Sequence, residues 1–235
     1  MAVDYQYRIV RDGLVLCLDA GNIKSYPGTG TTWFDRSGNG YNGTLVGGPT
    51  YSSSNGGSIV FDGVDDNITT NFDLDFTENN FTLCSWVNPN FISAIYGRPI
   101  MTMNTTGACE LYDFTLEFGR VSGKFSLGVG GSNGTYLYTQ NTYSQDSWYH
   151  ICATRIKNGA NNWTYIIYVN GSFSVTLTGN FNGGDGGKLT IGKFSGCSAV
   201  DEWSGKIAAV QIYNRTLAPE EILQNFNATR GRFGI

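Results

Sequence analysis

The chain has 235 residues, of which 40% are hydrophobic, 14% aromatic and only 14% charged. Average soluble proteins carry about 25% charged residues, so Asn, Ser, Thr and Gly must form much of the surface, and the aromatic content excludes a disordered chain. The net charge of −4 argues against nucleic acid as a partner, because non-specific nucleic-acid binding needs a basic surface.

Short runs of β-branched and aromatic residues, closed by Gly, Asn, Asp or Pro, predict a succession of β-strands. In chain order the expected strands are Leu14–Leu18, Ser58–Phe61, Asn67–Thr70, Phe81–Val87, Arg98–Met103, Asp113–Phe118, Lys124–Val129, Thr135–Tyr138, Trp148–Ile156, Thr164–Val169, Ser172–Leu177, Lys188–Ile191 and Lys206–Tyr213. Asn170 and Gly171 predict a tight hairpin, because both positions of such a turn need positive φ. The pattern favours an all-β fold, a two-sheet antiparallel β-sandwich that forms one domain over residues 1–235.

One short helix is predicted near the C-terminus, over Pro219–Thr229. Proline suits the first helical position, and Ile222 and Phe226 lie on one face, so we expect the helix to cap the edge of the sandwich. The preceding Ala218 lacks a capping oxygen, which costs about 1 kcal/mol of helix stability. In the strand before the helix, we expect Ala208, Val210 and Ile212 to form the core face.

The five cysteines are widely spaced and form no CxxC pair, which fits neither a disulfide framework nor a zinc site. We interpret Cys17 and Cys84, which lie in predicted strands, as small buried hydrophobic residues. The alternative is a cross-link between subunits through Cys109 or Cys197, both in Gly-rich surroundings.

Four stretches resemble the laminin-G-like jelly rolls of the concanavalin-A-like superfamily: Leu14–Tyr51, Ser58–Thr70, Phe81–Pro89 and Trp203–Gly234. They carry the motifs WxDxSGNGxNGTL, FDGxDD and GKIxxxxIYNRxLxxEEI in the family's order. The resemblance implies a concanavalin-A-like jelly roll along the whole chain.

The long C-terminal stretch also resembles stand-alone jelly rolls of tailed-phage virion proteins. This resemblance implies a structural or adhesion module of the virion, either a capsid decoration or a tail-fibre component, present in multiple copies. Its partners would be other virion subunits, including copies of itself. The N-terminal sequence MAVDYQYRIVRDG has no secretory pattern, and no apolar run approaches a membrane span, so we expect synthesis in the host cytoplasm and no membrane partner.

The superfamily includes glucanases, and retaining glycosidases need two carboxyl groups about 5–5.5 Å apart. Glucanase relatives use an ExDxE-type strand, and this chain has no such string. The cluster of carboxyl groups that comes nearest to such a string is Glu110, Asp113 and Glu117, which we interpret as solvated side chains. The single histidine, His150, is interpreted as a hydrogen-bonded strand residue. We therefore predict that the chain is not an enzyme.

Two kinds of binding site are candidates. Asp62, Asp65 and Asp66 resemble the acidic loop of some calcium-binding jelly rolls, and calcium prefers such oxygen ligands. The alternative is an Asx-turn at Asp62, with the other two opening a strand. A lectin that binds cell-surface glycan, with calcium as candidate cofactor, is the alternative function. Aromatic side chains that could stack on sugars are Tyr96, Tyr136, Tyr138 and Trp163, whereas Trp86, Trp148 and Trp203 are expected in the core.

Overall fold

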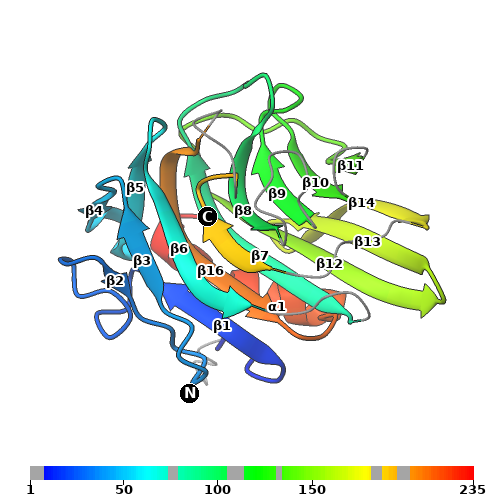
Figure 1. Cartoon of the computed structure of the whole chain (residues 1–235), viewed down its shortest axis with the longest axis horizontal. Coiled ribbons are helices and arrows are strands. Elements are labelled where there is room, and N and C mark those ends of the chain that lie inside the picture. Colours follow the sequence, from blue (N-terminus) through cyan, green and yellow to red (C-terminus); the bar gives the residue numbers. More distant parts are fainter. Residues whose placement is uncertain (1–7, 74–78, 105–113, 131–133, 181–186, 195–201) are drawn as a thin grey trace, which may run out of the picture.

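The computed structural model describes residues 8–73, 79–104, 114–130, 134–180, 187–194 and 202–235. Two antiparallel sheets pack face to face (Figure 1), which confirms the predicted all-β sandwich with one short C-terminal helix. No helix among these residues is long and apolar enough to cross a membrane.

The two sheets, here called sheet I and sheet II, contain eight strands each. Sheet I has the order β14 (Ser172–Gly179), β13 (Asn162–Val169), β12 (Tyr149–Gly159), β7 (Phe81–Pro89), β16 (Ser204–Tyr213), β5 (Ser58–Asp62) and β4 (Thr50–Ser52), and β1 (Leu14–Asp19) also pairs with β16. Sheet II has the order β11 (Thr135–Tyr138), β10 (Phe125–Val129), β9 (Phe114–Phe118), β8 (Arg98–Asn104), β15 (Lys188–Ile191), β6 (Asn67–Asp73), β3 (Gly43–Val46) and β2 (Thr32–Trp33). Every predicted strand is present; the short strands β2, β3 and β4 were not predicted.

The hairpin between β13 and β14 forms as expected, since Asn170 and Gly171 have φ of 51° and 75°. The core lies between the two sheets and is built from alternate residues of their strands. Its large members include Trp33, Phe61, Phe72, Phe81, Phe118, Phe125 and Trp203, each exposed by 2% or less.

Strand β16 differs from its predicted pattern. Val210 and Ile212 face the core as expected, but Ala208 does not. A bulge between Ile207 and Ala209 interrupts the pairing with β7, so Ile207 faces the core and Ala208 turns to the opposite side. A bulge adds one residue to the strand, and this reverses the alternation on either side of it.

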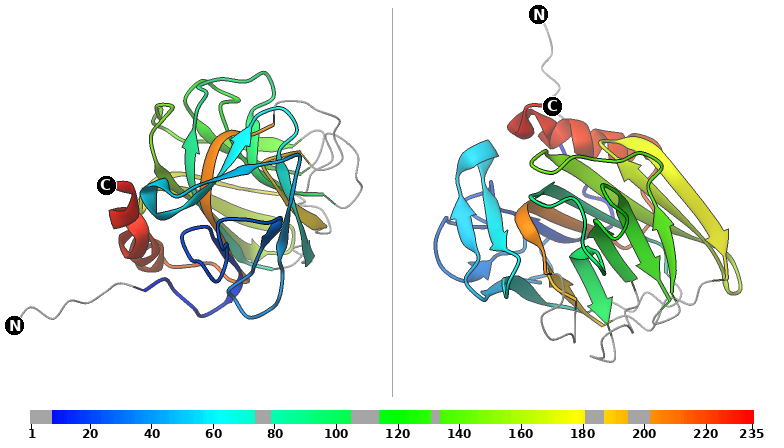
Figure 2. Two further views of the ribbon diagram at one scale, coloured as in Figure 1. Left: turned by 90° about the vertical axis from the view of Figure 1, so that its left-hand side faces the viewer. Right: turned by 90° about the horizontal axis from the view of Figure 1, so that it is seen from above.

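Helix α1 (Pro219–Thr229) has the predicted bounds but a different place. It lies across the outer face of sheet I and not at the sandwich edge (Figure 2), with Ile222 and Phe226 buried against the strands. The predicted position at the sandwich edge was wrong. The outer face of sheet I is apolar, like its core face, and the helix covers it. The missing cap at Ala218 is offset by Glu221, whose carboxylate accepts the Ala218 backbone N–H at 2.9 Å and binds Arg215.

Cys84 and Cys152 form a disulfide, which corrects the interpretation of Cys84 as a free thiol. The two residues face each other across β7 and β12, strands that are far apart in sequence, so no local spacing indicates the bond. Cys17 is free and buried, as predicted, and burial raises the pKa of its thiol to about 12. Cys109 and Cys197 lie outside the described residues.

Asp35 explains the WxDxSGNG motif physically. Its Oδ1 accepts the backbone N–H groups of Cys17 and Ser37, at 2.9 and 2.8 Å. Its Oδ2 accepts those of Gly40 and Tyr41, at 3.1 and 3.2 Å. One buried carboxylate therefore ties the glycine-rich loop to strand β1.

Replacing Asp35 with alanine is expected to lower the free energy of unfolding by about 2 kcal/mol. Hydrogen bonds to charged groups contribute about 1.5–3 kcal/mol each, but the loop donors can turn to water. Urea unfolding measures the loss, with Asp35→Asn as the control that keeps an acceptor oxygen and loses the charge. Unchanged stability in Asp35→Asn would contradict a role for the charge.

Candidate functional site

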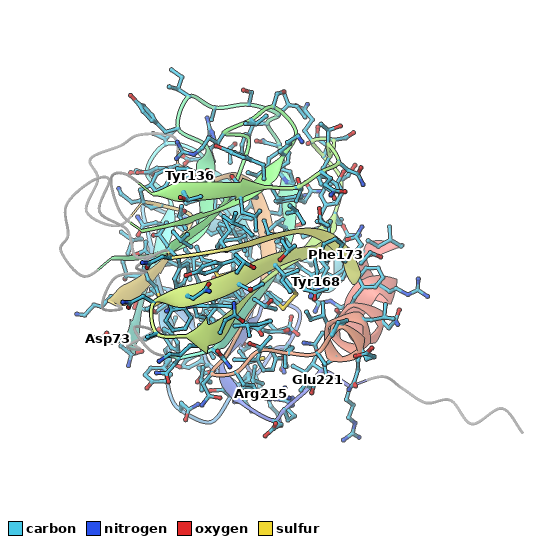
Figure 3. The ribbon with its side chains drawn as sticks, turned by 90° about the vertical axis from the view of Figure 1, so that its right-hand side faces the viewer. Asp73, Tyr136, Tyr168, Phe173, Arg215 and Glu221 are labelled. Carbon is cyan, nitrogen blue, oxygen red and sulfur yellow. A yellow bond between two sulfur atoms is a disulfide. The ribbon has the colours of Figure 1, made fainter. Side chains whose placement is uncertain are left out.

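A pair of tyrosines lies on the outer face of sheet II, at its β11 edge. Leu116, Leu127 and Leu137 are paired across β9, β10 and β11 and face the core. Tyr136 and Tyr138 flank Leu137 and are half-buried, so strand alternation turns both away from the core. Figure 3 shows Tyr136 on its strand, remote from α1.

The two rings are arranged as a stacked platform. Their centroids are 6.0 Å apart with an interplanar angle of 23°. The guanidinium carbon of Arg120 lies 4.1 Å from the centre of the Tyr136 ring, a cation–π contact. Gly128 makes room for that ring, since a Cβ there would lie 2.7 Å from Tyr136 Cε1. Two predicted ligand-binding residues are thus brought together because they are two apart on one strand and share its outer face.

Glu117 lies beneath Arg120 and is completely buried, which corrects its interpretation as a solvated carboxylate. Arg120 donates to it from Nε at 2.5 Å and Nη2 at 3.2 Å, and Ser126 Oγ donates at 2.9 Å. Burial raises the pKa of the Glu117 carboxyl, and these hydrogen bonds oppose the shift. Glu110 and Asp113 lie outside the described residues.

The ion pair of Glu117 and Arg120 could not be predicted from the local sequence, in which only the three-residue spacing links the two residues. Strand alternation places Glu117 on the outer face with Thr115, but its burial follows from Arg120, which comes from the turn after β9. Sequence reasoning missed both Arg120 and Ser126 as parts of the site.

Replacing Arg120 with leucine is expected to lower the free energy of unfolding by about 2 kcal/mol at neutral pH. Breaking a fully buried pair costs about 3–5 kcal/mol, and Arg120 is partly exposed. Because the folded-state pKa of Glu117 is raised, the folded chain binds a proton more tightly than the unfolded chain. Stability from this group is greatest below its unfolded pKa and falls as pH rises through the folded pKa.

Urea unfolding of Arg120→Leu at about pH 4 and pH 7 tests this, and we expect the smaller loss at the lower pH. The double variant Glu117→Gln/Arg120→Leu serves as control, because it has no buried charge and should show the same loss at both pH values. A loss in the single variant that does not depend on pH would contradict a buried, titrating Glu117.

The other two predicted aromatic residues have different surroundings. Tyr96 is 51% exposed and precedes Gly97, where a Cβ would lie 2.9 Å from the Glu117 carboxyl carbon, so its backbone borders the same site. Trp163 is 3% exposed and packs in the core, with the Arg155 guanidinium 3.5 Å from its ring centre. The expected exposure of Trp163 is wrong, because β13 begins at Asn162 and turns the indole inward.

A row of polar residues continues from Tyr136 across sheet II. Each strand from β10 to β2 contributes one residue to this row, and each residue is paired with the next one. In order these residues are Gly128, Thr115, Thr102, Thr190, Thr69, Thr44 and Thr32. Thr44 and Thr69 are exposed, whereas Thr102 and Thr115 are completely buried. The accessible hydroxyls therefore lie at the far end of the row.

The carboxylates of Asp62, Asp65 and Asp66 come together, with ligand atoms within 4.8 Å of one another. Asp66 Oδ2 accepts the Asp62 N–H at 2.9 Å, and Asp62 Oδ1 accepts the Val64 N–H at 2.8 Å, the expected Asx-turn. Burial raises the pKa of Asp66, and the neighbouring carboxylates add to the shift. Backbone N–H groups of the same turn bind two of the three carboxylates, and calcium stays a prediction.

Comparison with known proteins places the fold in a group of related structures. The model of the concanavalin A-like lectin/glucanases superfamily matches residues 61–223. No curated protein matches the chain in sequence. Domain 4 of AbnA, a GH43 extracellular arabinanase from Geobacillus stearothermophilus in complex with arabinotriose, has a TM-score of 0.67 at 18% identity, covering 90% of this chain and 97% of that one.

Two larger proteins also contain the fold. The receptor-binding domain of botulinum neurotoxin type G has a TM-score of 0.67 at 15% identity, covering 92% of this chain and 51% of that one. Trypanosoma rangeli sialidase in complex with 2,3-difluorosialic acid gives 0.68 at 16% identity, with 92% and 33% covered. The chain thus spans about half of the toxin domain and a third of the sialidase. At these identities the likeness shows the fold alone, and the neighbours include carbohydrate- and receptor-binding domains.

Proposed function

Because the chain belongs to the concanavalin A-like lectin/glucanases superfamily, we propose that it is a non-enzymatic module that binds a glycan at the outer face of sheet II. The observation that carries the proposal is the stack of Tyr136 and Tyr138 beside Arg120. Partly exposed aromatic rings offer an apolar face for a sugar ring together with a hydroxyl group that can hydrogen-bond. The arabinanase domain, which contains bound arabinotriose, supports the choice of ligand class.

The charges at the site favour a neutral sugar. Arg120 is held by Glu117 through two hydrogen bonds, so its charge is already compensated. The same pairing supports the proposal of a non-enzymatic module, because Glu117 is buried and engaged by Arg120 and Ser126.

Glycan binding can be tested on an array of neutral oligosaccharides, followed by titration calorimetry with the best ligand. Tyr136→Ala and Tyr138→Ala are each expected to weaken binding about tenfold, the effect of about 1.4 kcal/mol at a well-packed contact. Phe173→Ala is the matched control, because Phe173 is an exposed aromatic residue of sheet I, beside α1 (Figure 3). Unchanged affinity in both tyrosine variants, or hydrolysis of the bound glycan, would overturn the proposal.

We further propose that the module acts in a tailed-phage virion, as a multi-copy capsid decoration or tail-fibre component. The support is the resemblance of Trp203–Gly234 to such proteins. Its partners there would be virion subunits, with a host-surface glycan as the second partner. Co-sedimentation with particles from infected cells tests this, and a chain found only as a free monomer would contradict it.

A further inference from the structure

Two sulfur atoms and one imidazole lie together beneath α1, on the outer face of sheet I. Cys84 of β7 and Cys152 of β12 are directly opposite, and His150 precedes Cys152 by two residues and shares its face. The ligand atoms of the three residues lie within 4.8 Å of one another, and all three residues are buried. The two sulfurs are joined as a disulfide (the yellow bond in Figure 3), so His150 is the member whose role is open.

The ring of His150 lacks a strong polar partner. Its Nδ1 and Nε2 lie 3.9 and 3.7 Å from Cys152 Sγ, and no oxygen or nitrogen of the described residues bonds either one. The ring lies beside both Trp86 and Phe226, with centroid distances of 5.1 and 6.1 Å. A buried polar group without a partner costs free energy, so this imidazole has an unused lone pair in an apolar enclosure.

We propose that, once the disulfide is reduced, Cys84, Cys152 and His150 bind one cuprous ion. Reduction adds two electrons and two protons to the Sγ–Sγ bond and yields two thiols, with a phosphine or small dithiol as the reductant. Binding of Cu⁺ releases both protons and leaves two thiolates and one neutral imidazole as ligands. Soft sulfur donors favour this ion.

The number of ligands selects Cu⁺ over Zn²⁺. Structural zinc is almost always bound by four ligands. No fourth His, Cys, Asp or Glu joins this group in the part of the chain that the structure describes. The site lies on the opposite sheet from the tyrosine stack, so the two proposals succeed or fail independently.

The test uses the full chain with Cys17→Ser, Cys109→Ser and Cys197→Ser, so that only the two ligand cysteines remain. After anaerobic reduction by a phosphine, the chain is titrated with Cu⁺ against a coloured cuprous chelator, and one ion per chain is expected. X-ray absorption should then show two sulfur ligands and one nitrogen ligand. The same polypeptide left oxidised is the matched control and should retain no ion.

A second variant adds His150→Phe to this background. Loss of an outer-shell partner alone weakens metal binding about 10–100-fold, so loss of this ligand should weaken it by at least about 100-fold. If that variant misfolds, the nitrogen ligand in the X-ray absorption of the unaltered site still decides the question. Failure of the reduced chain to retain Cu⁺, a shell without nitrogen, or tighter binding of Zn²⁺ would overturn the proposal.

Discussion

Replacing Trp86 with alanine is expected to lower the free energy of unfolding by about 3–5 kcal/mol, the usual cost of removing a buried tryptophan. Trp86 is 1% exposed and connects sheet I to the C-terminal segment. Its ring stacks on Phe233 and Phe226, with centroids 4.1 and 5.7 Å away. Its Nε1 donates to Thr229 Oγ1 at 2.8 Å, so the variant loses a hydrogen bond as well as packing.

Urea unfolding followed by far-ultraviolet circular dichroism measures this loss. Trp86→Phe is the control: it keeps an aromatic ring and loses the hydrogen bond, so we expect a loss of about 1–2 kcal/mol. Phe233→Ala alone and combined with Trp86→Ala completes a double-mutant cycle, and the two losses should not add because the rings touch. Additive losses would contradict the packing of the C-terminal segment on this strand.

The position of α1 follows from a feature that the sequence does contain. In β7, the core-facing residues Phe81 and Leu83 alternate with Cys84 and Trp86, so both faces of the strand are apolar. A strand of this kind needs cover on both sides. Helical periodicity identifies the buried face of α1, but only the two-sided pattern of β7 indicates which surface receives it.

Contacts between distant strands could not be predicted from local patterns. Cys84 and Cys152 become neighbours only through the register of β7 against β12. The proximity of Tyr136 and Tyr138 could be predicted from the sequence, because residues two apart in one strand share a face. Trp163 was misplaced because the predicted strand began at Thr164 and left this residue outside it, whereas β13 begins at Asn162.

Reducing the Cys84–Cys152 disulfide is expected to lower the free energy of unfolding by about 4 kcal/mol. The bond joins residues 68 apart in sequence, and its opening restores the conformational entropy of that loop in the unfolded chain. The folded state should change little, because β7 and β12 remain paired along their length. Urea unfolding with and without a phosphine reductant, under metal-free conditions, measures the difference.

The variant Cys84→Ala/Cys152→Ala separates the bond from the reagent. It should be about as unstable as the reduced chain in the absence of reductant, and the phosphine should not change it further. Cys17→Ser provides the matched control. The Cys17 thiol is buried near the bond but free, so this variant should keep the full effect of reduction.

Because loop entropy acts through the unfolded state, the loss should appear mainly as slower refolding if β7 and β12 pair early, and as faster unfolding if they pair late. Equal stability of the oxidised and reduced chains would show that the bond does not constrain the unfolded chain.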